Sequence, residues 1–206
     1  MELFNTQNEW ISQKFKGVIL PEGLVSNVEF NDCSFIKCSL RETTFLEGKF
    51  SECTFQACDL SLANLKGSTF IHNRFEDSQL VGINWTETSW AKNKFLKPVD
   101  FFACVINHST FSALDLKKIA ITRCTARDVD FSEANLSGAD CRFSDFSSSR
   151  FLHTNLTGAD FSGATNYSII PGLNTLKDAR FSLPEAMALL EGLEIVLTDY
   201  QSPPFP

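Results

Sequence analysis

A five-residue spacing of apolar side chains runs through most of this chain and restricts its fold more than any other feature. From Phe30 to Phe161, 27 positions at this spacing are all apolar, and 16 of them are Phe or Trp. The spacing slips once, by one residue, across 96–100, so that Phe95 is followed by Phe101. Neither the 3.6-residue period of a helix nor the two-residue period of a strand produces this pattern.

A second, smaller inward position lies two residues before most of these apolar centres. Cys, Ala, Ser, Thr and Gly dominate it, and it holds six of the seven cysteines, while Cys141 is itself a centre. One large and one small inward residue in every five predict a chain that turns a corner at each repeat. Each side of a coil then stacks on its equivalent in the next coil.

This regularity resembles the pentapeptide-repeat family, whose A-(D/N)-L-x-x units build a right-handed, four-sided β-helix. Ala134-Asn135-Leu136 and Ala159-Asp160-Phe161 match such units, and the match covers roughly 25–165. The resemblance implies an all-β fold, a right-handed quadrilateral β-helix, in which the 27 centres make just under seven coils. Every fourth centre should stack, which predicts one aromatic column: Phe30, Phe50, Phe70, Trp90, Phe111, Phe131, Phe151.

The single slip in the spacing has two interpretations. Proline cannot donate to a strand ladder and is tolerated at bulges. The favoured interpretation is therefore a local bulge or kink formed by Lys97, Pro98, Val99 and Asp100. A functional loop is the alternative, although one extra residue makes a short loop.

Neither a catalytic site nor a cofactor site is expected. The cysteines form no C-x-x-C, and Cys33/Cys38 and Cys53/Cys58 lie five residues apart, which is no familiar metal spacing. The three histidines, His72, His108 and His153, fall at scattered phases of the repeat. A filled rod offers no cleft for chemistry, so we expect no enzyme, no cofactor and no metal.

The net charge of −7 is concentrated in the last third of the chain. Residues 1–127 carry 14 acidic and 14 basic side chains, whereas 128–206 carry 11 acidic and four basic ones. Binding to nucleic acid depends on Lys and Arg neutralising phosphates, so this region is not expected to bind it directly. An acidic rod fits a basic groove built for duplex DNA by charge complementarity, although acidic surfaces usually serve solubility alone.

A different pattern follows the repeats. Ser182 and Glu185 have the spacing of a capping box, Pro184 suits a first helical turn, and Gly192 suits a helix end. We expect a short helix and then a short strand that cap the solenoid end. The apolar stripe exceeds what a cap needs and predicts a two-fold dimer interface, formed by these residues: Leu183, Ala186, Met187, Leu190, Leu193, Ile195, Leu197.

Three regions are therefore expected along the chain. Residues 1–24 form an N-terminal lead-in and first coil, 25–165 form the β-helix, and 166–206 form the capping and dimerisation module. The start of the chain lacks the basic head and apolar run of a signal peptide. No stretch approaches the roughly 20 apolar residues that span a bilayer, so we expect a cytoplasmic protein that does not contact the membrane.

Three segments resemble the albicidin-resistance group of pentapeptide proteins: Gly82-Ile83-Asn84-Trp85-Thr86, Asn166-Tyr167 and Ala179-Arg180-Phe181-Ser182-Leu183-Pro184-Glu185-Ala186. A rod followed by a capped helix and strand is also similar to the Qnr-type and mycobacterial fluoroquinolone-resistance proteins. That resemblance implies a homodimer that binds DNA gyrase, in some members also topoisomerase IV, and protects it from inhibitors by imitating DNA. The implied gyrase-facing acidic surface comprises Asp128, Asp130, Glu133, Asp140, Asp145 and Asp160.

One departure from the Qnr-type pattern concerns loops. Many Qnr-type proteins carry two long loops that contribute to protection, whereas here the period is interrupted only by the slip at 96–100. The chain therefore resembles the loop-free members, and the resemblance implies gyrase binding more directly than protection from quinolones. The competing hypothesis is a scaffold or interaction protein with an unrelated partner.

Overall fold

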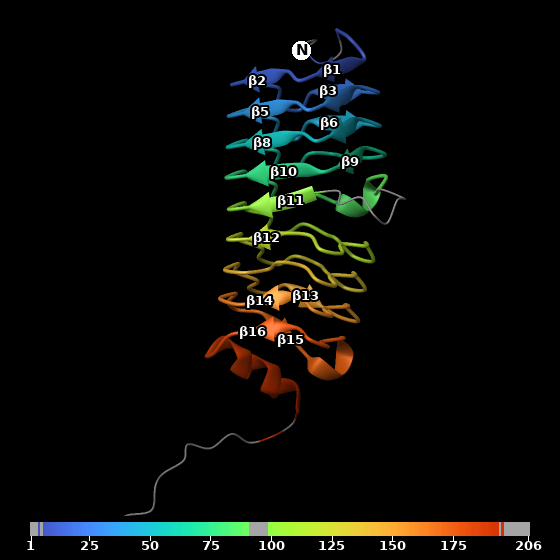
Figure 1. Ribbon diagram of the computed structural model, residues 1–206. Helices are drawn as coiled ribbons and strands as arrows, with labels where there is room; N and C mark the ends of the chain where they lie inside the picture. The colour runs from blue at the N-terminus through green and yellow to red at the C-terminus, as the bar shows by residue number, and fades with distance from the viewer. Residues whose placement is uncertain (1–3, 5, 91–98, 194, 196–206) are drawn as a thin grey trace, which may run out of the picture.

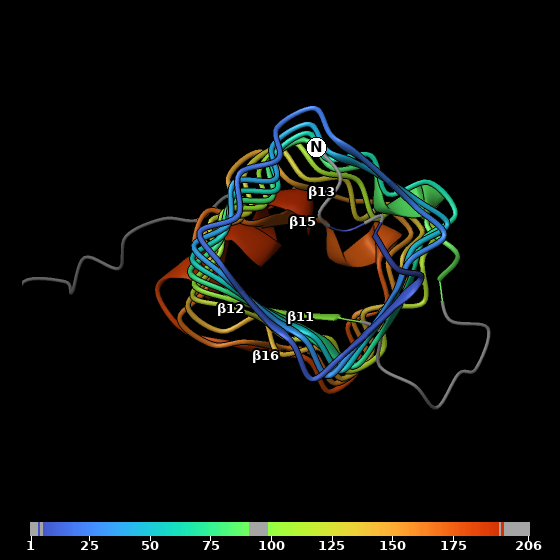
Figure 2. The ribbon, with the colours of Figure 1, turned by 90° about the horizontal axis from the view of Figure 1, so that it is seen from above.

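The protein is a right-handed, four-sided β-helix of about eight coils, capped at its C-terminal end by short helices (Figure 1). The computed structural model describes residues 4, 6–90, 99–193 and 195. Viewed along its axis, the chain follows a nearly square outline (Figure 2). The predicted fold class is confirmed.

Every strand is short and pairs in parallel with its equivalent one coil away. The longest sheet has six strands: β2 (Lys14–Lys16), β5 (Ser34–Ile36), β8 (Thr54–Gln56), β10 (Asn73–Glu76), β11 (Val99–Phe102), β12 (Ile121–Thr122). A four-stranded sheet contains β1 (Glu9–Ile11), β4 (Glu29–Asn31), β7 (Lys49–Ser51) and β9 (Thr69–Ile71). Three pairs complete the set: β3 (Leu24–Ser26) with β6 (Thr44–Leu46), β13 (Arg150–Phe151) with β15 (Ser168–Ile169), and β14 (Asp160–Phe161) with β16 (Arg180–Phe181).

The corners of the rod explain why the chain turns every five residues. The residue two places after a centre has a left-handed backbone, as at Asp32 (φ 52°), Asp77 (φ 49°) and Glu133 (φ 60°). This conformation costs a non-glycine residue roughly 1–2 kcal/mol, which the ladder and the packed interior offset. The corner N–H finds a carbonyl in the next coil, as when Asp32 N donates to Ser51 O at 2.9 Å.

The apolar centres fill the interior as stacked rings. Phe35 and Phe55 stack with ring centroids 4.5 Å apart and planes 3° from parallel. The predicted aromatic column is correct from Phe30 to Phe70 and from Phe111 to Phe151, but its link through Trp90 is wrong. Phe111 stacks on Trp85 at 5.6 Å and 11° rather than following Trp90, because the coil between them is longer than the period indicated.

The small inward residues join neighbouring coils by hydrogen bonds. Ser144 Oγ accepts from Cys124 N at 2.9 Å and donates to Ile121 O at 2.7 Å. Cys53 Sγ donates to Phe30 O at 3.2 Å in the equivalent way. All seven cysteines are buried thiols, and burial raises the pKa of Cys53 to about 12. Cys53 therefore serves as a neutral, weakly polar interior residue.

The interruption near residue 96 is larger than one residue, so the predicted one-residue slip is wrong. In the coils before it equivalent residues lie 20 apart, as in Phe55↔Phe75, but Phe75 pairs with Phe101, 26 residues on. The six extra residues lie between Trp90 and Val99, and the rod is therefore not free of insertions. The predicted bulge residues Lys97 and Pro98 lie outside the described residues.

The other two predicted bulge residues belong to regular structure. Val99 and Asp100 form the start of β11 and pair in register with Asn73 and Arg74 of β10. Asp100 Oδ1 also accepts a hydrogen bond from Ala120 N at 2.7 Å, which ties β11 to the next coil. Neither residue is part of a bulge.

The C-terminal helix differs from the predicted one in type and in its cap. The described end contains η3 (Pro171–Leu173) and η4 (Glu185–Leu193), and η4 is a 3₁₀-helix, as is η2 (Trp85–Glu87) earlier in the chain. The predicted capping box is not formed, because Ser182 Oγ accepts from Gly163 N at 2.8 Å. Of the predicted strand, Leu193 lies in η4 and Ile195 is not in a strand, while Val196 and Leu197 lie outside the described residues. Among the described residues, no helix combines the length and the apolar character that a membrane span requires.

Candidate interaction surface

The six predicted acidic residues are spread around the rod rather than gathered on one patch. Asp140 and Asp160 lie one above the other on the face of the six-stranded sheet. Asp130 pairs with Thr110 and Arg150 on another face, and Asp145 pairs with Thr125 and Thr165 on a third. Asp128 (φ 55°) and Glu133 (φ 60°) occupy corners.

Four of these carboxylates help to build the corners that follow them. Each accepts a hydrogen bond from the backbone N–H two residues later: Asp130 from Ser132 (2.9 Å), Asp140 from Arg142 (3.2 Å), Asp145 from Ser147 (3.1 Å), Asp160 from Ser162 (2.9 Å). This is the Asx-turn, in which the side chain holds its own turn in place. These four aspartates therefore have a structural role whatever else they do.

Basic side chains also lie beside most of the six acids. Asp145 pairs with Arg127 at 2.8 Å, Asp140 with Arg142 at 2.7 Å, Asp130 with Arg150 at 3.5 Å and Asp160 with Arg180 at 3.8 Å. Asp128 contacts His108 at 2.9 Å. Within the described residues, Glu133 makes no ion pair. The local negative field is therefore weaker than the formal charge of this region indicates.

Asp145 is the most strongly held of these acids. Partial burial opposes ionisation of its carboxyl group. The hydroxyl of Ser147, the amide of Asn166 and the guanidinium of Arg127 outweigh that effect and hold the pKa of Asp145 well below its usual range. The folded state thus binds this proton more weakly than the unfolded state. Its stabilisation is fully present above the ordinary pKa of 3.8 and is lost as the pH falls toward the lowered value.

Replacement of Asp145 by alanine should therefore destabilise the protein in a pH-dependent way. At pH 7 we expect the free energy of unfolding to fall by about 1–2 kcal/mol, because a charged acceptor and its hydrogen bonds are removed. At about pH 2 the loss should be smaller, since wild type has by then lost part of the same stabilisation. Urea titrations at both pH values measure the difference. A Glu133→Ala control should change stability by less than about 0.5 kcal/mol, and an equal Asp145→Ala loss at both pH values contradicts the assignment.

The predicted dimer residues lie in and around η4, and the exposed ones form a narrower stripe than predicted. Because a 3₁₀-helix has three residues per turn, Met187, Leu190 and Leu193 share one face. Met187 is 45% exposed and Leu193 49% exposed. The remaining residues vary: Leu183 and Ile195 are exposed, Ala186 and Leu190 are half-buried, and Leu197 lies outside the described residues. Ala188 and Leu189 pack against the core of the rod.

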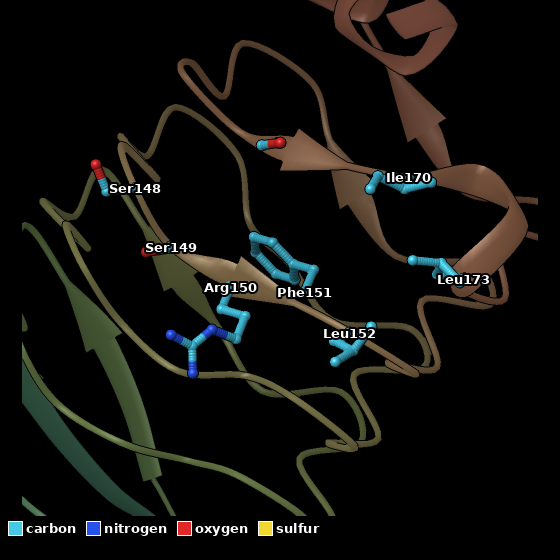
Figure 3. A pocket seen from close by; sticks show the side chains of 8 residues that line it. Ser148, Ser149, Arg150, Phe151, Leu152, Ile170 and Leu173 are labelled. Atoms are coloured by element: carbon cyan, nitrogen blue, oxygen red, sulfur yellow. The ribbon is translucent and has the colours of Figure 1, made fainter. Parts of the chain in front are cut away.

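A groove of about 380 Å³ lies beside η3 and was not expected from the sequence (Figure 3). Phe151 forms its floor, Leu152, Ile170 and Leu173 line it, and Arg150 lies at its edge. The groove forms where the coil shortens, because Phe151 pairs with Ile169, only 18 residues on. The only sequence signal was the loss of the repeat after Asn166-Tyr167. Within the described residues, no group of His, Cys, Asp and Glu side chains could hold a metal ion.

Two exposed phenylalanines were also missed, because they lie at outward positions of the repeat. Phe102 and Phe143 each lie against an arginine from the preceding coil, Phe102 against Arg74 and Phe143 against Arg123. The signal that marks them is an aromatic side chain off the five-residue phase. We refer to these four residues as the Arg–Phe strip.

Comparison with known proteins supports the repeat and the fold. Profiles described as "Pentapeptide repeat region" and "Pentapeptide repeats" match residues 28–98 and 127–163, together just over half of the chain. No curated protein matches it in sequence. A trypsin-treated variant of QnrB1, a plasmid-mediated fluoroquinolone resistance protein, has a TM-score of 0.63 at 17% identity, with 93% of this chain and 99% of that chain covered. Full-length QnrB1 has a TM-score of 0.52 at 18% identity, covering 91% and 100%. At these sequence identities, the comparison shows that the two proteins share a fold.

Proposed function

Because this chain belongs to the pentapeptide-repeat family, we propose that it works by binding a protein partner, and that the partner is DNA gyrase, with topoisomerase IV as a second target. Binding protects the topoisomerase from an inhibitor or poison and so confers antibiotic resistance or self-immunity. The protein acts as a binding protein and not as an enzyme, and it needs no cofactor. Gyrase acts on the bacterial chromosome, so the proposal places the protein in the cytoplasm.

The observation that carries this proposal is the end-to-end likeness to QnrB1, which covers 93% of this chain and 99% of that one. A shared fold does not fix a shared partner. The coverage nevertheless means that the shared fold extends over nearly the whole of both chains, which supports a test of this chain in the same role. QnrB1 is a fluoroquinolone resistance protein, and gyrase inhibitors are the compounds with which to test this chain.

The rod has dimensions and charge that support imitation of DNA. About eight coils at about 4.8 Å each give roughly 38 Å, the length of about eleven base pairs. The six predicted acids lie on three faces and two corners, as phosphates lie all around a duplex. Asp128 and Glu133 stand at corners, the outermost points of the cross-section, and take no part in the Asx-turns. They are the acids we expect to contact a basic groove.

Reversing the charge of those two corners tests the proposal. Asp128→Lys with Glu133→Lys should weaken inhibition or protection of gyrase by at least about tenfold, because two attractive contacts become repulsive. DNA supercoiling by gyrase, with and without a fluoroquinolone or albicidin, measures the effect. Glu47→Lys with Glu52→Lys is the matched control, since these residues occupy two successive corners with the same left-handed backbone in an N-terminal coil. Equal activity of both double variants contradicts a role for the acidic third.

A scaffold or interaction role with an unrelated partner is the second candidate. The observation that favours it is the structural use of Asp130, Asp140, Asp145 and Asp160, whose Asx-turns any such solenoid needs. If the whole acidic excess is of this kind, wild type will leave gyrase and topoisomerase IV unaffected. The supercoiling measurement therefore separates the two candidates before any variant is made.

We include a homodimer in the proposal, joined through the C-terminal module. The exposed stripe of η4 supports it, because an apolar row at the end of a rod is stabilised when a second copy covers it. Two rods joined in this way give an assembly about twice as long as one rod, with both acidic thirds beside the two-fold axis.

A further inference from the structure

The Arg–Phe strip combines two exposed aromatic rings with two cations at fixed positions. The Arg74 guanidinium carbon lies 5.8 Å from the ring centroid of Phe102, and that of Arg123 lies 5.4 Å from the ring centroid of Phe143. Phe102 is 37% exposed and Phe143 is 58% exposed. The two phenylalanines are separated by two coils, or roughly 10 Å along the rod. Single exposed apolar side chains are common on protein surfaces, so the feature that sets this strip apart is the pairing of each ring with an arginine.

Phe143 is held in a conformation that a phenylalanine adopts only at a cost. Its φ is +61°, in the left-handed region where a bulky side chain is unusual. Its ring lies over Gly163 of the next coil, where an added Cβ would stand only 2.5 Å from Phe143 Cδ1. The absence of a side chain at Gly163 leaves room for the ring. The other corners share this backbone, as at Leu62 (φ 60°), so the conformation fixes the position of the Phe143 ring but does not by itself mark a functional site.

We propose that the Arg–Phe strip is the surface that docks onto the protein partner, and that it receives a segment with a carboxylate beside an apolar side chain. The inference rests on the proposed function, and the partner meant is therefore DNA gyrase. Aromatic residues and arginine are the types enriched at the cores of protein interfaces. Arg123 makes no ion pair within the described residues, and its guanidinium can therefore hold a partner carboxylate through two parallel hydrogen bonds.

The charges around the strip favour an acidic protein segment over nucleic acid. Arg74 already pairs with Glu76, and Asp77 lies at the next corner of the same coil. Asp100 and Asp140 lie on the same face as the strip. A phosphate backbone would meet these carboxylates along its whole length, since its charges recur every few ångströms. A single partner carboxylate that binds only Arg123 is not forced against these carboxylates.

Replacement of Phe143 by asparagine tests the proposal. Asparagine tolerates a positive φ, so the variant should fold with an unfolding temperature no lower than that of wild type. We expect its affinity for purified gyrase, measured by surface-immobilised binding, to fall at least about tenfold, as for loss of an aromatic anchor. Leu62→Asn is the matched control: Leu62 has φ +60°, lies over Gly82, and is also exposed, but on another corner. Its affinity should equal that of wild type.

Each alternative result has a definite meaning. Wild-type binding that survives in Phe143→Asn overturns the role of the strip and leaves the proposed function standing. An equal loss of gyrase affinity in Phe143→Asn and Leu62→Asn also overturns it, because the loss would then come from the change at a corner and not from the Phe143 ring. Wild type that does not bind gyrase overturns the proposed function and, with it, this docking surface. Binding of single-stranded oligothymidine by wild type but not by Phe143→Asn assigns the strip to nucleic acid instead, by stacking.

Discussion

Replacement of Phe131 by alanine is expected to lower the free energy of unfolding by about 4 kcal/mol. Phe131 is fully buried, and its ring stacks between Phe111 at 5.5 Å and Phe151 at 5.3 Å. It also meets Phe146 edge to face at 6.1 Å. The coils above and below are held in register by backbone hydrogen bonds, so they cannot close the cavity that the missing ring leaves. Guanidinium titration followed by circular dichroism measures the loss.

Phe143→Ala is the matched control for that measurement, because it removes the same side chain from an exposed corner. Its effect should stay below about 1 kcal/mol. Each coil of the rod contacts only its neighbours, so loss of the Phe131 ring should also make the coils before and after Phe131 unfold less cooperatively with each other. A loss at Phe131 no larger than that at Phe143 contradicts the stacked interior as the main source of stability.

Met187→Asp combined with Leu193→Asp is expected to convert a dimer into monomers, with a dissociation constant raised at least about 100-fold. Both residues lie on the exposed face of η4, and each new carboxylate would be buried against its symmetry mate without a partner. Sedimentation velocity should show wild type at twice the 23.0 kDa chain mass and the variant at 23.0 kDa.

Ile19→Asp serves as the control for assembly, because Ile19 is exposed in an early coil at the other end of the rod. This variant should remain dimeric. A double variant of η4 that still sediments as a dimer places the interface elsewhere, with the groove of Phe151, Ile170 and Leu173 as the next surface to change. Wild type that sediments as a monomer contradicts the proposed dimer.

The repeat was predictable because each five-residue unit obeys one local rule, from its inward centre to its left-handed corner. The length of the insertion was not predictable, because the phase of a five-residue repeat is unchanged when five further residues are added. Six extra residues and one extra residue give the same phase, and Phe95 continues the apolar spacing in the sequence. For the same reason, the predicted aromatic column continued from Trp90 to Phe111. In the structure, Phe111 stacks on Trp85 instead.

The candidate site was predicted less well than the fold. Ion pairs such as Asp130–Arg150 and the stacked pair Asp160–Arg180 join residues 20 apart, a spacing that means nothing until the coil length is known. The type of the final helix also escaped prediction, since over nine residues an apolar stripe fits three or 3.6 residues per turn almost equally well. Phe143 lay outside the pattern that drew attention to the other phenylalanines.

Competition for gyrase tests the central proposal most directly. A fluorescent DNA duplex is bound to purified gyrase, and the protein is added while the anisotropy of the DNA is followed. We expect the protein to displace the duplex at about micromolar concentration, and the Asp128→Lys, Glu133→Lys variant to do so at least about tenfold less well. A duplex that stays bound to gyrase and to topoisomerase IV at about 100 μM protein contradicts the proposal.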